Sequence, residues 1–289
     1  MYIQRASVFT TDPATTVKEL QGELKQYTDY YFRRINKFII LTLLGIHQCI
    51  NHKSVPTSTA VFLTTESGNM YDTETVLNQM YHDHEFPMPI NFINTMSNTA
   101  SFYAAQSIGA ESRNLTLSAK AFSFERGLEL ARCDLELGAV SSLLVGGVDV
   151  MTFSLKQLKE KFGSTIDQYT LVEGSAWLYI TRDRTGASGE ILDIKSFTHR
   201  EQALAWLEGC PKEKSAIAFS TPLSDSEKAC WQQAAGTDTV YEYLAEFGYF
   251  DSTAACGIAG FVSGSRKERL IHVNRNSHDC YLLTLLRNF

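Results

Sequence analysis

The sequence has 289 residues, of which 44% are hydrophobic and 20% charged, with 18 glycines and 6 prolines. This composition is ordinary for a globular protein and excludes a disordered or low-complexity chain. The net charge is −6 and the sequence has no basic stripe, so nucleic acid is not an expected partner. At ~100–200 residues per domain, the length predicts one large domain or two closely joined halves.

The sequence also predicts a soluble, cytoplasmic protein. Its first residues lack a basic start followed by an apolar core, so we expect no signal peptide. The longest apolar run, residues 38–46, is far shorter than the ~20 residues that cross a bilayer, so we expect no membrane partner. The cysteines form no CxxC pair, which predicts reduced thiols and no zinc site. They are Cys49, Cys133, Cys210, Cys230, Cys256 and Cys280.

Apolar periodicity predicts the elements of the first half of the chain. Residues 30–50 are apolar at the i, i+3, i+4 spacing of a helix, with basic residues on the other side. In chain order, the sequence then predicts a strand at 59–64, a turn at 66–69, helices at 73–81 and 94–108, a strand at 114–119, a helix at 124–137 and a strand at 139–150.

The second half continues the alternation of helices and strands. The sequence predicts strands at 176–182, 189–196 and 216–221, helices at 224–234 and 254–262, and closing strands at 270–274 and 280–286. Such alternation throughout a chain is typical of the α/β class.

Two motifs that suggest ligand binding have simpler interpretations. The segment His82-Asp83-His84-Glu85 has the residue types of a metal site. Residues two apart do not share a helix face, so we interpret it as an exposed polar turn and expect no metal. The pair Gly146-Gly147 lacks the spacing of a dinucleotide or phosphate loop and indicates a bulge or a close backbone approach. We therefore expect no cofactor.

Five segments, in order, resemble the β-ketoacyl synthases of the thiolase fold. Residues 34–38 (RINKF) are similar to that family's "RMDRF" helix start, and residues 112–147 to its strand, nucleophile turn, helix and "AGG" strand. Residues 172–176 (VEGSA), 220–225 (STPLSD) and 248–260 are similar to "GEGAG", "TSTPAGD" and "GHxxAAAGxAG". The resemblance implies two pseudo-symmetric halves in a layered αβαβα arrangement. These would be residues 1–152 and a shortened 153–289, forming one compact unit.

The residues at the family's catalytic positions lack the side chains that ketosynthase catalysis needs. Ketosynthases use a cysteine thiolate at a helix N-terminus and two histidines, with backbone amides as an oxyanion hole. Matching the anchors puts Ala121 at the nucleophile position and Ile217 at the first histidine. The second histidine falls at Asp251 or Tyr249, depending on the glycine used. The glycine-rich loop corresponds to residues 274–281, and residues 274–289 contain no glycine. We therefore expect no catalytic residue at these positions.

The resemblance is strongest to the chain-length factor of bacterial aryl polyene biosynthesis. It implies a non-catalytic subunit that forms a heterodimer with an active β-ketoacyl-[acyl carrier protein] synthase and shapes its elongation tunnel. The acyl carrier protein would be reached through that partner, since carriers are acidic and this chain is too. Two alternatives stay open. One is an enzyme with relocated chemistry at His278 and Asp279, and the other is a self-associating acyl-binding protein without a catalytic partner.

The resemblance also implies where the partner binds. In this fold the strand before the nucleophile pairs with its mate across the dimer axis. Here it comprises Asn114, Leu115, Thr116, Leu117, Ser118 and Ala119. Phe122 and Phe124 would plug the dead pocket or limit the partner's tunnel, unless they are ordinary core residues. Met96, Phe102 and Tyr103 lie on the helix beside that contact.

Overall fold

The computed structural model describes residues 1–30, 32–210, 214–265 and 268–289, and its elements alternate as the α/β prediction requires. The strands are β1 (Tyr2–Thr11), β2 (Ala60–Thr64), β3 (Asn114–Leu117), β4 (Ser142–Asp149), β5 (Glu173–Thr181), β6 (Gly189–Phe197), β7 (Ser215–Phe219), β8 (Arg269–Arg275) and β9 (Tyr281–Asn288). The helices are α1 (Val17–Leu24), α2 (Lys37–Ile50), α3 (Met70–Tyr81), α4 (Pro89–Asn94), α5 (Asn98–Ile108), α6 (Ser123–Leu137), α7 (Leu155–Phe162), the 3₁₀ helix η1 (Gly163–Gln168), α8 (Arg200–Glu208), α9 (Asp225–Ala235), α10 (Tyr243–Phe247) and α11 (Thr253–Gly264).

One strand pattern occurs twice. In the first half, β2 lies parallel to β4, which is antiparallel to β5, which is antiparallel to β1. In the second half, β7, β8, β9 and β6 repeat these relations. The parallel bridge from Ile217 to Val240 takes the place that β3 has beside β2. The predicted pseudo-symmetry is therefore confirmed.

The halves join where β1 meets β6, in an overall order of β3-β2-β4-β5-β1-β6-β9-β8-β7. The sequence analysis expects a division after residue 152, which stays a prediction. The strand β5 follows that residue and pairs with β4 and β1, so the strand pairing favours a boundary after Thr181.

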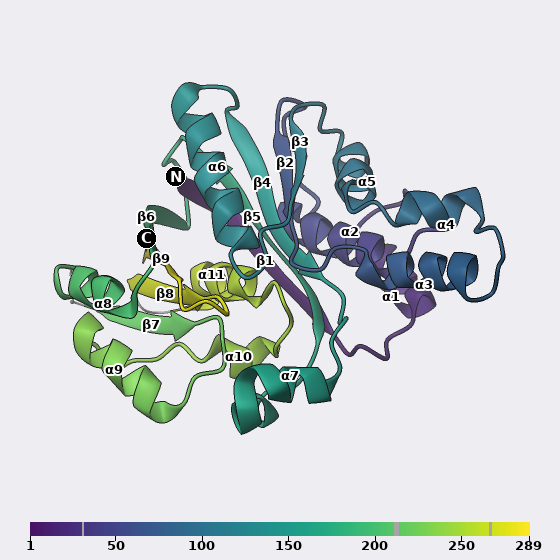
Figure 1. Cartoon of the computed structure of the whole chain (residues 1–289). Coiled ribbons are helices and arrows are strands. Elements are labelled where there is room, and N and C mark those ends of the chain that lie inside the picture. The colour runs from purple at the N-terminus through teal and green to yellow at the C-terminus, as the bar shows by residue number, and fades with distance from the viewer. Residues whose placement is uncertain (31, 211–213, 266–267) are drawn as a thin grey trace.

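Three clusters of buried apolar side chains define the layers. The central cluster lies around α6 and α11, between the two halves of the sheet (Figure 1). A second cluster packs α1, α2 and α5 against the first half, and a third packs α8 and α9 against the second half. This is the αβαβα arrangement that the resemblance implies. Burial of both sheet faces explains why β2 and β7 are continuous apolar runs.

The helix predicted at residues 30–50 begins later than expected. Residue 31 lies outside the described residues, and residues 32–36 are not helical. Asn36 is the N-cap, since its Oδ1 accepts from the Ile39 N–H at 2.9 Å. The helix ends at Asn51, which has a left-handed conformation with φ of 48°. The apolar period predicted the body of α2 but not the cap.

The predicted close backbone approach at Gly146 and Gly147 is present. A Cβ added at Gly146 would lie 2.1 Å from the Trp177 ring, and one at Gly147 would lie 2.6 Å from the Ala255 Cβ. The two glycines thus let β5 and α11 pack closely on β4. Within the described residues, no helix combines the length and the apolar character needed to cross a membrane.

Candidate functional site

A cavity of about 730 Å³ lies between the two halves. It is lined by residues that follow the carboxyl ends of β2, β7 and β8, together with the start of α6 and the end of α7. The carboxyl ends of parallel strands commonly form binding sites in α/β proteins. The lining residues are Glu66, Ser67, Ala119, Lys120, Ala121, Phe153, Lys161, Phe162, Ser220, Thr221, Tyr249, Asp251, Ala254, Asn274, Arg275, Asn276, Ser277, His278 and Asp279.

The turn before α6 brings Ala121 to the cavity. Lys120 has a φ of 54°, a left-handed conformation that reverses the chain just before the helix. The Ala121 carbonyl oxygen accepts from Asn274 Nδ2 of the other half at 2.6 Å. The position that the resemblance gives to the nucleophile is therefore at a helix N-terminus in the cavity. Its side chain is a methyl group, which cannot attack a thioester.

The four degenerate positions do not all converge. Ala121, Tyr249 and Asp251 line the cavity. Ile217 is fully buried on β7, in the cluster that packs against α8 and α9. The structure brings Thr221, two residues beyond β7, to the cavity wall instead.

Carboxyl groups dominate one wall. Ser67 Oγ donates to Asp251 Oδ2 at 2.8 Å, and Glu66 lies close enough for the Asp251 charge to raise its pKa. Burial is the larger cause and raises the pKa of both carboxyls. Lys161 opposes this shift and favours the ionised form of each. A pair of like charges in one cavity disfavours simultaneous ionisation.

Beneath this wall, Asp149 joins the two halves. Its carboxylate accepts from the Glu66 N–H at 2.9 Å and the Ser67 N–H at 3.0 Å, and from the hydroxyls of Thr65 and Ser252. Burial raises the pKa of Asp149 to about 7, with the Asp251 charge as the second cause. Asp149 thus fixes the loop after β2 to the start of α11. The sequence analysis missed Glu66 and Asp149 as site residues, although acidic residues at the carboxyl ends of buried strands were a usable signal.

A second buried polar group lies behind Ala121. Glu125 is fully buried on α6, and burial raises its pKa to about 7. His272 of β8 has its Nδ1 3.9 Å from Glu125 Oε1, and its Nε2 lies 3.0 Å from the Tyr243 hydroxyl. Burial lowers the pKa of His272 to about 3, so the imidazole is neutral at physiological pH. This histidine does not line the cavity.

The relocated-chemistry alternative finds little geometric support. His278 and Asp279 line the cavity rim, but the His278 ring contacts only Ser277, at 3.4 Å, in the hydrogen bonds described. None of the described residues that line the cavity is a cysteine. Apart from this contact of Ser277, no described hydrogen bond joins a serine or threonine of the cavity to an imidazole.

The residues expected at the partner interface divide into two groups. β3 is an edge strand, and Phe102 is exposed on α5 beside it. Met96 is also exposed, but it lies in the link before α5 and not on that helix as expected. Tyr103 is partly buried and contacts Phe102 edge-on. Phe122 and Phe124 are buried in the central cluster. Phe122 and Phe124 therefore have the position of ordinary core residues.

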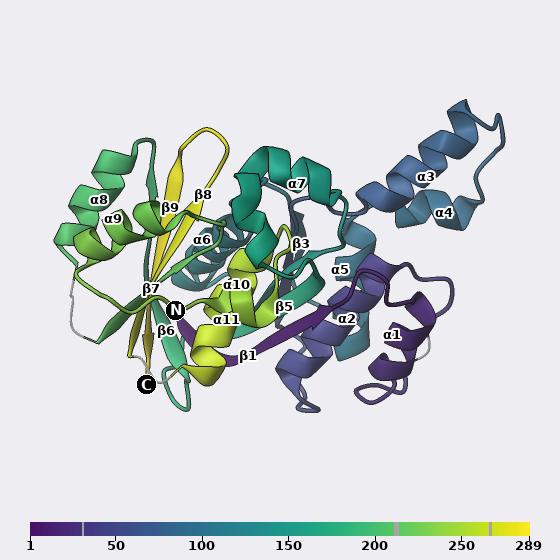
Figure 2. The same ribbon diagram turned by 90° about the horizontal axis from the view of Figure 1, so that it is seen from below.

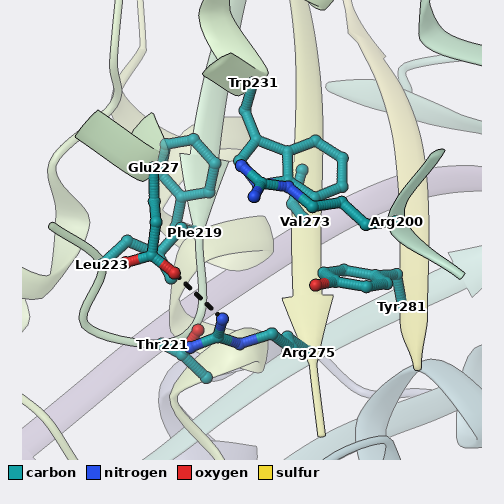
Figure 3. A pocket seen from close by; sticks show the side chains of 9 residues that line it. All are labelled: Arg200, Phe219, Thr221, Leu223, Glu227, Trp231, Val273, Arg275 and Tyr281. Carbon is teal, nitrogen blue, oxygen red and sulfur yellow. Dashed lines mark hydrogen bonds and ion pairs between the residues drawn. The ribbon is translucent and has the colours of Figure 1, made fainter. Parts of the chain in front are cut away.

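Two further features are not candidate sites. The segment from His82 to Glu85 is an exposed turn after α3, and the described residues hold no group of side chains suited to a metal ion. A small cavity of about 10 Å³ beside α9 has room for little more than one water molecule. Figure 3 shows the ion pair of Glu227 and Arg275, 3.1 Å long, at its wall.

A scan against protein-family models and a search of curated proteins matched nothing. Solved structures do match. The ishigamide ketosynthase/chain length factor superposes with a TM-score of 0.72 at 13% identity, over 100% of this chain and 99% of that one. The 3-oxoacyl-[acyl-carrier-protein] synthase III of Aquifex aeolicus VF5 gives 0.61 at 12%, over 99% of each chain. A complex of a ketosynthase with its chain length factor from Xenorhabdus doucetiae gives 0.53 at 11%, over 100% of both. The chain therefore has the thiolase-like fold of the ketosynthases.

Proposed function

We propose that this chain is a chain-length factor, the non-catalytic subunit of a heterodimer with an active β-ketoacyl-[acyl carrier protein] synthase. In this role it shapes the tunnel in which the partner elongates an acyl or polyene chain in type II polyketide (aryl polyene) biosynthesis. The carrier protein delivers its substrate to the partner. This chain supplies part of the tunnel wall and no nucleophile.

The cavity at Ala121 is the observation that carries the proposal. The ketosynthase fold retains a cavity of about 730 Å³ at the helix N-terminus where the nucleophile would sit. That cavity holds a methyl group at the nucleophile position and a carboxyl, Asp251, at one expected histidine position. Decarboxylative condensation forms an enolate, which an adjacent carboxylate would repel and an imidazole would stabilise. Retention of the fold without these groups supports a structural role.

The edge strand β3 supports the pairing. The carbonyl oxygen of Arg113, just before β3, accepts from the Val61 N–H of β2 at 2.9 Å, and that of Leu117 accepts from the N–H of Thr65, just after β2, at 3.0 Å. Successive residues of a strand alternate in direction, so Thr116 directs its backbone groups away from β2. On that side β3 has no strand partner among the described residues.

The other end of the sheet, at β7, is covered by the chain's own backbone. The Ile217 N–H donates to the Thr239 carbonyl oxygen at 3.0 Å, and the Tyr241 N–H donates to that of Ile217 at 2.8 Å. Among the described residues, the end strand β7 is therefore covered by the chain itself, whereas the end strand β3 has an open side. An open edge is a template for another strand.

The test is co-expression with an active ketosynthase of the aryl polyene type, with the mass of the purified species measured by light scattering. We expect a one-to-one complex with the wild-type chain. Thr116→Pro removes the outward N–H and leaves the β2 ladder intact, so it should weaken the complex at least tenfold. The Thr116 hydroxyl also donates to the Ser101 hydroxyl, and both substitutions remove this hydrogen bond. Thr116→Val keeps the backbone N–H, so it should retain the complex.

Three results would count against the proposal. A wild-type chain that forms a homodimer and ignores the ketosynthase would favour the self-associating acyl-binding alternative. Equal binding by the proline and valine variants would show that β3 is not the contact. Condensation activity of this chain alone, with malonyl-loaded carrier protein as the probe, would show that it is an enzyme.

A further inference from the structure

The segment 70–96 forms a projecting arm, called here the α3–α4 arm. Figure 2 shows α3 and α4 extending away from the layered body. Of the described residues of α3, Val76 alone is buried. The large apolar side chains exposed on the arm are Met70, Tyr71, Leu77, Met80, Tyr81, Phe86, Met88, Phe92, Ile93 and Met96. Phe86, near the tip, is 99% exposed.

The base of the arm is fixed to the body. Asn36 Nδ2 donates to Asn69 Oδ1 at 2.9 Å and to Asp72 Oδ2 at 2.8 Å. Asn94 Nδ2 donates to the Arg34 carbonyl oxygen at 3.3 Å. These contacts hold both ends of the arm against the N-cap of α2. The exposed apolar surface therefore belongs to a positioned element, and apolar surface of this extent marks an interaction site.

The charge of the arm limits what can cover it. No Lys or Arg occurs between Lys53 and Arg113, whereas the arm carries Asp72, Glu74, Asp83 and Glu85. Anionic lipid, an acidic carrier protein and the same arm of a second copy would all be repelled. The complementary surface is an apolar groove with a cationic rim.

Four of the six methionines of the chain lie on the arm. Methionine is flexible and polarisable, so a methionine-rich surface adapts to an irregular groove. The arm is also continuous with the open edge of the sheet. A short link leads from α4 to α5, where the exposed Phe102 stands, and Asn114 Nδ2 of β3 donates to the Ser101 carbonyl oxygen at 2.9 Å.

We propose that the α3–α4 arm docks in an apolar groove rimmed by Lys and Arg on the ketosynthase partner. This inference rests on the proposed function, and it assigns the arm as a second contact beyond β3. The apolar side chains supply the buried area, and the carboxylates select a cationic rim. The arm thereby discriminates the partner from a second copy of this chain.

The experiment measures the dissociation constant of the complex with the ketosynthase. The triple variant Phe86→Ser, Met88→Ser, Phe92→Ser removes apolar surface from exposed positions, so the fold is retained. We expect at least tenfold weaker binding, since exposed aromatic anchors carry much of the affinity of an interface. The matched control is Leu137→Ser, Leu192→Ser, Phe289→Ser, which changes exposed apolar residues outside the arm and should leave binding unchanged.

A second variant tests the charge argument. Glu74→Lys, Glu85→Lys should weaken the complex at low salt by slowing association. Its affinity should then depend less on ionic strength than that of the wild type.

The outcomes separate the two proposals. A wild-type complex that the arm variants do not weaken overturns the arm inference and leaves the proposed function standing. A homodimer of the chain alone that the triple variant dissociates also overturns it, because a second copy then covers the arm. Absence of any complex with the wild-type chain overturns the proposed function itself. Weakening by the arm variants and not by the control supports the inference.

Discussion

Asn274 and Glu125 join the two halves directly behind the cavity, with Asn274 Nδ2 donating to Glu125 Oε1 at 2.8 Å. The same Nδ2 donates to the Ala121 carbonyl oxygen. The amide of β8 therefore fixes the start of α6 through a carboxyl that is fully buried. Because burial raises the pKa of Glu125 to about 7, the charge at this junction changes near neutral pH.

The first prediction follows from that pKa. A folded-state pKa of about 7, above the usual 4.5, means that the neutral carboxyl favours the folded state. The contribution of Glu125 is fully present below pH 4.5 and is lost as the pH rises through 7. In urea unfolding, Glu125→Gln should therefore become more stable relative to the wild type by about 3 kcal/mol between pH 4.5 and pH 8.

The control is Glu208→Gln, which changes an exposed carboxyl on α8. Its stability relative to the wild type should stay constant over the same range. His272 does not confound the comparison. Burial lowers the pKa of His272 to about 3, below the pH range compared, and both proteins contain this histidine. If the difference in stability between Glu125→Gln and the wild type did not change with pH, the buried carboxyl would not titrate in this range.

The second prediction concerns the packing of the layers on β4. At Gly146 an added Cβ would lie 2.1 Å from the Trp177 ring, which is fully buried and cannot move aside easily. Gly146→Ala should lower the free energy of unfolding by about 3 kcal/mol, as an overpacked core residue does. Gly22→Ala is the matched control, since an added Cβ there meets nothing within 4 Å. Placed in the exposed face of α1, that change should raise stability by up to about 1 kcal/mol. Equal effects of the two substitutions would contradict the packing argument.

Much of the fold was predictable because its strands are short apolar runs between helices. The run at 59–64 corresponds to β2 and that at 216–221 to β7, each fully buried. The sequence analysis did not predict β1, α1, α4, α7, η1, α8 or α10. The reason is visible in the helices. In α7, Leu155, Leu158 and Phe162 have helical spacing, and in α8 Ala203 and Leu207 do. These helices have only eight and nine residues, so each period covers about two turns and the sequence analysis did not use it.

The candidate site was predictable only in part. A gapless count back from Gly146 leads to Ala121, which lines the cavity just before α6. The same count from Thr221 reached Ile217, whose side chain belongs to the outer cluster, because alternate residues of a strand face opposite sides. Glu66 and Asp251 are far apart in the chain, and only the meeting of the two halves brings them to one cavity. Local patterns contain no information on such pairs.

The last prediction tests this placement chemically. Ala121→Cys puts a thiol in the cavity at the N-terminus of α6, whereas Ile217→Cys puts one in a fully buried cluster. With a maleimide, Ala121→Cys should gain one adduct over the parent protein by mass spectrometry, and Ile217→Cys none under native conditions. Cys133 is exposed and reacts in both, so each variant is compared with its parent in a Cys133→Ser background. The Ala121→Cys protein should still lack condensation activity, because the expected histidine positions hold Ile217 and Asp251 or Tyr249, none of which can stabilise an enolate as an imidazole does. Restored activity from this single change would show that the cavity retains catalytic groups. Labelling of Ile217→Cys as fast as Ala121→Cys would place the strand β7 differently from the structure.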